Sequence, residues 1–327
     1  MAEVLIIGAG SWGTAFGVLL AGAGHNVTLY ERLPEYAREM AAKRQNPTFL
    51  PDIPFPESLQ VSNELDGLER FQWCISAVPT RFVRSEFTRL AEHYPADLPL
   101  VSLSKGIEQE TLKFPTQVLA ECTSAKHLLC LSGPSHAEEV ARGLPAVVVS
   151  AGDESRAQAL AELVSTPSFR VYYSTDLAGV ELSGAAKNVV AIAAGIVDGL
   201  KLGDNAKAAL IARGLAEIVR LGLATGAEER TFSGLSGIGD LFTTCTSMHG
   251  RNLRFGRRIG EGEKPDEIIA SMQMVVEGYN TARALRELAR QQNVEMPICE
   301  EVCNVIYDGA DAREAVTRLM TRSLKAE

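Results

Sequence analysis

The sequence is poor in the residue patterns that hold metals. Its six cysteines form no Cys-x-x-Cys pair, and its five histidines are scattered without a His-x-x-x-His spacing. Cys299 and Cys303 lie one helical turn apart, but no histidine or further cysteine stands nearby to complete a tetrahedral shell. Cys74 and Cys130 fall inside predicted buried strands, which is typical of reduced core thiols. We therefore expect no metal site.

Basic runs and long uninterrupted apolar spans are also missing. The formal net charge is −9, and no cluster of lysine and arginine offers a footprint for nucleic acid or anionic lipid. The N-terminus has no basic region before its first apolar run, so we expect no signal peptide. The most apolar stretch, residues 180–197, carries Glu181 and Lys187. These absences predict a cytoplasmic protein without membrane insertion, in which any anionic substrate must meet a local cluster of cations.

The first half of the chain alternates short β-rich runs with helical patterns. With 327 residues, 46% of them hydrophobic, the chain is long enough for two globular domains. The alternation predicts an α/β fold with a doubly wound parallel sheet and helices on both faces. The predicted strands are residues 4–7, 26–30, 73–76, 98–103, 128–131, 146–150 and 169–173. The predicted helices between them are residues 14–23, 34–43, 81–93 and 154–165.

The second half is predicted to be all-helical. After residue 173 the β-branched runs stop, and apolar residues recur at helical spacing. The predicted helices are residues 179–199, 207–224, 279–291 and 297–307. We place the domain boundary at Ser174, giving domains 1–174 and 175–327, because Thr175 and Asp176 can cap the next helix. The long apolar helices of the second domain could support a homodimer.

A glycine-rich turn follows the first predicted strand directly. Residues 8–13 read Gly-Ala-Gly-Ser-Trp-Gly and open the first predicted helix. Gly8 permits the tight turn, Gly10 lets the backbone approach a pyrophosphate, and Gly13 allows the helix to pack closely on the strand. The helix N-terminus offers N–H groups to phosphates. A tight strand-helix loop is the alternative, but the strand-turn-helix context favours a dinucleotide site.

The end of the second predicted strand bears on which dinucleotide binds. Glu31 stands at roughly the distance where an acid contacts the adenine ribose of NAD, whereas Arg32 would attract the extra phosphate of NADP. Because both residue types are present, the preference between the two cofactors stays open.

Lys187 is the most informative charged residue. It lies within a predicted helix that is apolar or small on nearly every face, and no acidic residue stands three or four positions away. An unpaired buried ammonium is costly, so Lys187 must meet a partner from elsewhere in the fold or line a ligand cavity. A structural ion pair is one interpretation. The other is catalytic, because a desolvated lysine has the lowered pKa that proton transfer needs.

Further candidates follow predicted strands or stand in the helical half. Lys105 comes just after the strand at 98–103, and a Gly-Pro-Ser-His-Ala segment at 133–137 follows the strand at 128–131. Both lie at the carboxyl edge of the sheet, where ligands bind in doubly wound folds. In the helical half, flanking glycines can present Asp240, and Arg251 with Asn252 suits a phosphate or carboxylate. Each could also be an ordinary surface residue.

Taken together, several separated motifs indicate a family. They are Gly-Ala-Gly-Ser-Trp-Gly-Thr at 8–14, Ala-Val-Pro at 77–79, Ser-Lys-Gly at 104–106, Gly-Pro-Ser at 133–135, Lys-Asn at 187–188, Gly-Asp-Leu at 239–241, Arg-Asn at 251–252 and Val-Glu-Gly at 276–278. Over nearly its whole length the chain resembles the bacterial NAD(P)-dependent glycerol-3-phosphate dehydrogenases. The resemblance implies an N-terminal Rossmann domain and a C-terminal all-helical domain of the 6-phosphogluconate-dehydrogenase type. It also implies reduction of dihydroxyacetone phosphate to sn-glycerol 3-phosphate, which supplies phospholipid synthesis.

The resemblance also implies roles for individual residues. Lys187 would be the catalytic proton donor and acceptor, and Lys105 and Asp240 would orient it and the substrate. The expected substrate-binding residues are Lys105, Gly133, Ser135, Lys187, Asn188, Asp240, Thr244, Gly250, Arg251 and Asn252. With the glycine turn and the strand end, the expected cofactor-binding residues are Gly8, Gly10, Ser11, Trp12, Gly13, Glu31, Arg32, Lys105, Ala137, Arg251, Val275 and Glu277.

Three positions depart from the family pattern. Gly250 replaces a common serine, so a hydroxyl contact to phosphate would be missing; His136 replaces a phenylalanine; and Glu31 replaces a small residue.

Two other functions remain open. One is a hydroxy-acid dehydrogenase of the same architecture, and the other is a dinucleotide-binding sensor without catalysis, which would need neither Lys187 nor the Arg-Asn pair.

Overall fold

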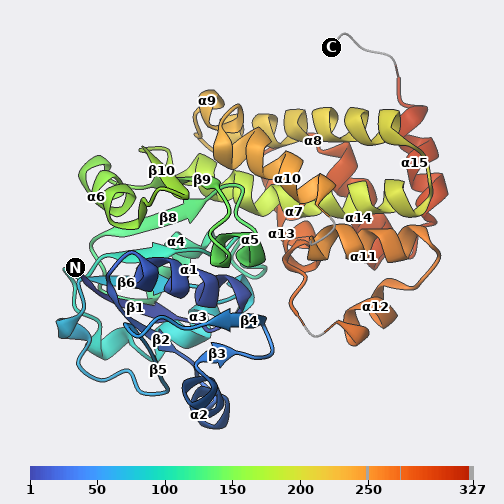
Figure 1. Ribbon diagram of the computed structural model, residues 1–327. Coiled ribbons are helices and arrows are strands. Elements are labelled where there is room, and N and C mark those ends of the chain that lie inside the picture. Colours follow the sequence, from blue (N-terminus) through green and yellow to red (C-terminus); the bar gives the residue numbers. More distant parts are fainter. Residues whose placement is uncertain (248–249, 273, 324–327) are drawn as a thin grey trace. The chain divides into compact units, whose positions relative to one another are not determined.

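The computed structural model describes every residue except 248–249, 273 and 324–327 (Figure 1). The chain forms two compact units. The first contains Met1–Lys105 and Phe114–Val180, and the second contains Gly106–Lys113 and Glu181–Glu327. The change between them at Val180 lies a few residues beyond the boundary expected at Ser174. The short segment Gly106–Lys113 was not foreseen as part of the second unit; there, the side-chain amide of Gln109 donates to the carbonyl of Asn280 at 2.9 Å.

The first unit is built on an eight-stranded sheet with the order β10-β9-β8-β7-β6-β1-β2-β5. Its strands are β1 (Glu3–Ile7), β2 (Asn26–Tyr30), β5 (Leu59–Ser62), β6 (Trp73–Ser76), β7 (Leu100–Ser102), β8 (Leu128–Ser132), β9 (Ala146–Ala151) and β10 (Phe169–Ser174). All seven predicted strands are present, so the predicted α/β architecture is confirmed. β5 and the hairpin before it were not predicted as strands. That hairpin pairs β3 (Gln45–Asn46) with β4 (Leu50–Pro54), whose two prolines argue against a strand in the sequence.

One strand pair differs from the expected parallel arrangement. β9 runs antiparallel to β8, whereas the other neighbours in the eight-stranded sheet are parallel. The connection from β8 to β9 holds only the five-residue helix α5 (Ala137–Ala141), which packs against α1 (Ser11–Gly22). Because the connection lacks a full helix that crosses the sheet face, the chain returns in the opposite direction.

Alternating residues of β1 explain how helices cover both faces of the sheet. Val4 and Ile6 pack in one core cluster with Phe16 of α1, and Leu5 and Ile7 pack in another with Phe87 of α3 (Thr80–Thr88). A strand with two buried faces reads as a continuous apolar run, as β1 does. The other helices of this unit are α2 (Pro34–Lys43), α3 (Thr80–Thr88), α4 (Pro115–Cys122) and α6 (Glu154–Val164). The helix predicted over 81–93 is divided into α3 and a 3-10 turn, η2 (Ala91–His93).

From Glu181 onward, the described residues of the second unit form helices and their connections, as predicted. The long helices α7 (Leu177–Gly199), α8 (Asp204–Ala224), α13 (Glu277–Gln291) and α14 (Pro297–Tyr307) agree with the four predicted ones. The expected cap is confirmed, because the carboxylate of Asp176 accepts the N–H of Gly179 at 2.9 Å. The shorter elements are α9 (Glu229–Phe232), the π-helical turn η3 (Leu235–Gly239), α10 (Asp240–Thr246), α11 (Arg251–Gly260), α12 (Pro265–Ser271) and α15 (Ala312–Met320).

Helix α7 is the core of the second unit. It is long and apolar enough to cross a membrane, but the apolar stretch is wholly buried inside the protein. Against α11 its backbone approaches without intervening side chains: a Cβ at Gly195 would lie 2.1 Å from the carbonyl oxygen of Leu253, and one at Gly256 would lie 2.0 Å from that of Ile192. Such contact requires glycine on both helices, so it fixes the middle of α11 against the C-terminal half of α7.

Candidate active site

The glycine turn has the geometry that the sequence predicts. Gly8 adopts φ +108°, and a Cβ there would lie 2.9 Å from the carbonyl oxygen of Ala77. A Cβ at Gly13 would lie 2.0 Å from the carbonyl oxygen of Gly8, so only glycine allows α1 to start this close to the turn. Gly10 is the N-cap of α1, and a Cβ there would meet no described residue within 4 Å outside its own helix and chain neighbours.

That open space lies at a helix N-terminus, where N–H groups and the helix dipole favour a phosphate. Beside it, the indole N–H of Trp12 is buried and meets no hydrogen-bond acceptor among the described residues. A glycine cradle with room at its centre and an unused buried donor fits a dinucleotide pyrophosphate.

Asn46 supports the turn, and sequence reasoning missed it. Its fully buried side-chain amide donates to the carbonyl of Ala9 and to the hydroxyl of Thr14, both at 2.8 Å. Its oxygen accepts the N–H of Phe49 at 2.9 Å, and the hydroxyl of Ser11 donates to the Phe49 carbonyl at 2.7 Å. The β3–β4 hairpin therefore holds the turn through side chains. Asparagine in a loop gives no signal for such a role, because only the tertiary fold brings it to the turn.

Beyond the turn, a cavity of about 150 Å³ opens at the end of β2. Glu31 and Arg32 line it, so the structure brings both candidate ribose contacts to one place. The Glu31 carboxylate accepts the N–H of Leu33 at 2.9 Å, and the Arg32 guanidinium forms an ion pair at 3.3 Å with Glu86 of α3.

Three predicted substrate residues meet at the carboxyl ends of β7 and β8. The ammonium of Lys105 donates to the carbonyl of Gly133 at 3.0 Å, and the hydroxyl of Ser135 donates to the same oxygen at 2.9 Å. Gly133 adopts φ +143°, and a Cβ there would lie 2.9 Å from the Cα of Val148. Ala137 follows two residues after Ser135, starts α5 and is buried. The sheet edge thus gathers Lys105, Gly133 and Ser135, as its topology predicts.

In the second unit, Lys187 finds the partner that its own helix lacks. Its ammonium forms a salt bridge with the carboxylate of Asp240 and donates to the hydroxyl of Thr244 at 2.8 Å, both on α10. The side chains of Lys187 and Asp240 are only 7% and 3% exposed, so water screens the pair little. The expectation of a partner from elsewhere in the fold is confirmed.

The turn before α10 explains how Asp240 reaches Lys187. η3 is a π-helical turn, and a Cβ at Gly237 would lie 2.1 Å from the carbonyl oxygen of Phe232. Such turns often occur at functional sites. The neighbouring thiol of Cys245 is also buried, and burial raises its pKa to about 12. It is therefore uncharged at neutral pH and adds no anion to the Lys187–Asp240 pair.

An amide network joins the other predicted substrate residues. The side chain of Asn252 donates to that of Asn188 at 2.9 Å and accepts the N–H of Gly278 at 3.0 Å, so it ties α11 to α7 and α13. Beside it, the Arg251 guanidinium donates to the carbonyl of Val275 at 3.0 Å. Gly250 is the N-cap of α11, and Glu277 starts α13. The structure therefore places Asn252 as a residue that positions the start of α11, where Arg251 lies.

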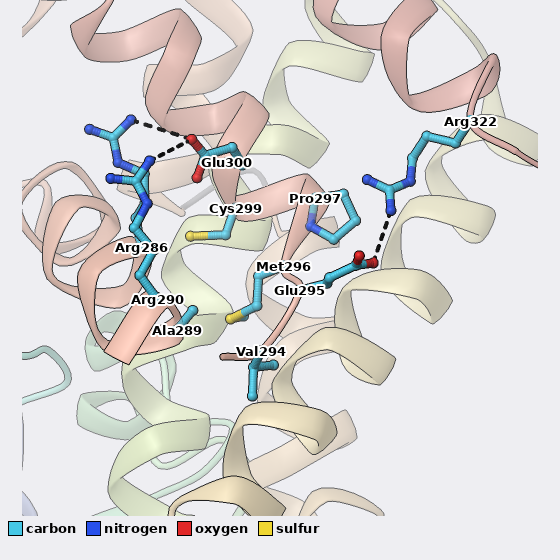
Figure 2. Close-up of a pocket in the computed structure, with 10 residues that line it drawn as sticks. All are labelled: Arg286, Ala289, Arg290, Val294, Glu295, Met296, Pro297, Cys299, Glu300 and Arg322. Atoms are coloured by element: carbon cyan, nitrogen blue, oxygen red, sulfur yellow. Dashed lines mark hydrogen bonds and ion pairs between the residues drawn. The ribbon is translucent and has the colours of Figure 1, made fainter. Parts of the chain in front are cut away.

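A second cavity of about 240 Å³ lies in the helical unit, and none of the predicted site residues lines it (Figure 2). Figure 2 shows arginines on its rim held by acids: Arg322 by Glu295 at 3.1 Å, and Arg290 by Glu300 at 2.9 Å. Because these cations are already neutralised, the cavity offers no focused charge to an anionic substrate.

A buried carboxylate stands beside this cavity at the start of α14. Glu217 of α8 is 3% exposed and accepts the N–H groups of Ile298 at 2.8 Å and Cys299 at 3.3 Å. The N-cap residue of α14 is Met296, which has no side-chain oxygen, so Glu217 replaces the missing cap from another helix. Burial nevertheless dominates and raises the pKa of the Glu217 carboxyl to about 7.

We expect Glu217 to make stability depend on pH. Its folded-state pKa lies above the ordinary value of 4.5, so its contribution is complete below that value and is lost as the pH rises through about 7. Denaturant unfolding should show wild-type stability falling by up to about 3 kcal/mol between about pH 5 and about pH 8. Glu217→Gln should flatten this slope. Glu263→Gln is the control, because the hydrogen bond from Arg258 lowers the pKa of the Glu263 carboxyl, and it should leave the slope unchanged. A slope in Glu217→Gln as steep as in the wild type would contradict the assignment.

These features define a class of protein. A glycine turn that opens a helix at the edge of a doubly wound sheet, with a second helical unit carrying a buried lysine–carboxylate pair, is the organisation of a two-domain nicotinamide-dependent dehydrogenase.

The chain belongs to the NAD-dependent glycerol-3-phosphate dehydrogenase family. The family's N-terminal model matches residues 3–158 and its C-terminal model matches residues 176–317. The chain is 48% identical to a glycerol-3-phosphate dehydrogenase [NAD(P)+] of Salinibacter ruber, covering 100% of this chain and 97% of that protein. It is 45% identical to one of Geobacillus thermodenitrificans, over 100% and 97% of the two chains. The crystal structure of glycerol-3-phosphate dehydrogenase from Coxiella burnetii matches with a TM-score of 0.94 at 37% identity, covering 98% and 99%.

Proposed function

We propose that the protein is an NAD(P)-dependent sn-glycerol-3-phosphate dehydrogenase that reduces dihydroxyacetone phosphate. The buried Lys187–Asp240 pair carries this proposal, because it provides a desolvated proton donor. The chain's relatives are named as enzymes with this activity. The product is a precursor of glycerophospholipids, and the expected place of action is the cytoplasm. A homodimer and the absence of membrane insertion stay predictions.

In this proposal Lys187 moves the proton. When bound, the nicotinamide supplies the hydride for C2 of the substrate. The Nζ of Lys187 donates a proton to the developing alkoxide oxygen and takes it back in the reverse direction. Asp240 orients this lysine through their salt bridge, and the hydroxyl of Thr244 fixes the ammonium further. Because the Lys187 ammonium is buried, its positive charge acts strongly on the nearby oxyanion.

Other residues hold the substrate. Arg251 binds the phosphate from the start of α11, with the main chain of Gly250 in place of a serine hydroxyl. Lys105 contacts both substrate and cofactor. The remaining substrate contacts in the proposal are Gly133, Ser135, Asn188 and Asn252. This set supplies the local cations that an acidic protein needs to bind an anion.

The dinucleotide is held by the glycine turn. Gly8, Gly10 and Gly13 give the backbone its approach to the pyrophosphate, and the cavity at the end of β2 takes the adenosine. The remaining cofactor contacts in the proposal are Ser11, Trp12, Glu31, Arg32, Lys105, Ala137, Arg251, Val275 and Glu277.

Oxidation of NADH and of NADPH with dihydroxyacetone phosphate tests the function. We expect the absorbance of the reduced nicotinamide to fall when dihydroxyacetone phosphate is added. Dihydroxyacetone, which lacks the phosphate, is the matched control and should not be turned over. Reduction of a 2-oxo acid in place of dihydroxyacetone phosphate would favour a hydroxy-acid dehydrogenase. Cofactor binding without turnover on either substrate would favour a dinucleotide sensor.

A further inference from the structure

The cavity at the end of β2 carries charges of both signs. Glu31 and Arg32 line it from the strand end, and Phe82 and Glu86 line it from α3. The neighbouring Arg81 stacks on the Phe82 ring, with its guanidinium 4.4 Å from the ring centroid. An adenosine in this cavity therefore meets two carboxylates and one arginine along its walls.

Glu86 is the fixed member of this group. One of its carboxylate oxygens lies 3.3 Å from the Arg32 guanidinium, and the other lies 3.4 Å from that of Arg89, which directly follows α3. The Glu86 side chain is 13% exposed, whereas that of Arg32 is 62% exposed. The carboxylate is thus held in place by its helix and by a second arginine, while Arg32 reaches across to it from the strand end.

We propose that Glu86 is a specificity-determining residue that makes this site select NAD(H) over NADP(H). The inference rests on the proposed cofactor site. A 2′-phosphate carries a charge of about −1.5 to −2 at neutral pH. It would enter a cavity where Glu31 and Glu86 already stand, and the positive charge of Arg32 is already neutralised by Glu86.

The balance of contacts favours an unmodified ribose. A 2′-hydroxyl donates a hydrogen bond to a carboxylate such as that of Glu31 without disturbing any ion pair. A 2′-phosphate gains Arg32 only by breaking the Arg32–Glu86 pair, and Glu86 then remains beside the phosphate because Arg89 still holds it. Selection therefore works by repulsion of the wrong cofactor as well as by attraction of the right one.

The test compares binding of NADH and NADPH by nicotinamide fluorescence, without substrate. Wild type should bind NADH more tightly. Glu86→Gln should tighten NADPH binding by about tenfold, which corresponds to about 1.4 kcal/mol, and should change NADH binding far less. Glu121→Gln is the matched control. Glu121 lies on α4 and pairs at 2.8 Å with Arg84, which is on α3 like Glu86, but Glu121 does not line the cavity. It should change neither constant.

Arg32→Ala separates repulsion from positioning. In the wild-type background it should weaken NADPH binding little, whereas in the Glu86→Gln background it should remove most of the gain. Preferential NADPH binding by wild type, or an unchanged ratio in Glu86→Gln, would overturn the inference. Weaker NADPH binding in Glu86→Gln would also overturn it, since Glu86 would then orient Arg32 for the phosphate. Turnover of dihydroxyacetone phosphate in these variants tests the proposed function separately.

Discussion

Lys187→Ala is expected to lower kcat for dihydroxyacetone phosphate reduction by about a hundredfold to ten-thousandfold, because that is what a positioned proton donor contributes. The alkoxide that forms would have to take its proton from water in a site built around a buried ammonium. NADH binding should persist, since the glycine turn and the cavity at the end of β2 belong to the first unit. Steady-state kinetics and a fluorescence titration measure the two effects separately.

The variant also leaves Asp240 buried without its ammonium partner, which should reduce stability by about 3–5 kcal/mol. Lys187→Ala combined with Asp240→Asn removes the stranded charge and should recover stability without recovering turnover. Lys207→Ala is the matched control, because it breaks another lysine–carboxylate pair, in which Lys207 of α8 contacts Asp198 of α7 at 2.8 Å. It should keep normal turnover. Near-normal turnover in folded Lys187→Ala would refute the catalytic role.

Gly256→Ala is expected to destabilise the second unit by about 3 kcal/mol or more, at the upper end of what overpacking does. The added methyl group would lie 2.0 Å from the carbonyl oxygen of Ile192, which is backbone and has no rotamer to change. α11 must then move away from α7. Because Asn252 and Arg251 lie in the first turn of α11, KM for dihydroxyacetone phosphate should rise as well.

Gly22→Ala provides the control for glycine content alone. Gly22 ends α1, and a Cβ there would approach no described atom within 4 Å beyond its own helix and chain neighbours. This substitution should be neutral or stabilise by about 0.5–1 kcal/mol. Thermal and denaturant unfolding compare the two variants. If Gly256→Ala unfolds at the wild-type denaturant concentration, the direct backbone contact between α7 and α11 is wrong.

Local pattern was enough to predict seven of the eight strands of the sheet, the long helices and the glycine turn. Each of these has a signal within a few residues: β1 is a continuous apolar run, and α7 keeps helical spacing over its whole length. The need of Lys187 for a distant partner was also readable, because burying a charge has a known energetic consequence. Which residue would answer that need was not derivable from spacing, since Asp240 is 53 positions away.

What escaped prediction depends on tertiary placement. The antiparallel direction of β9 follows from how α5 packs, and Glu217 caps α14 although 81 positions separate it from Ile298. Asn46 reads as an ordinary loop residue until the hairpin brings it beneath the glycine turn. Short helices such as α9 and α10 have too few residues to show a period.

The segment Gly106–Lys113 gives the order of synthesis a physical meaning. It leaves the ribosome between β7 and α4, yet it belongs with the second unit, and the residue that Gln109 contacts there is 171 positions further along the chain. The sheet of the first unit can assemble as it emerges, since domains generally fold from the N-terminus during translation. This short stretch, which directly follows Lys105, has to wait without its neighbours until α13 has been made.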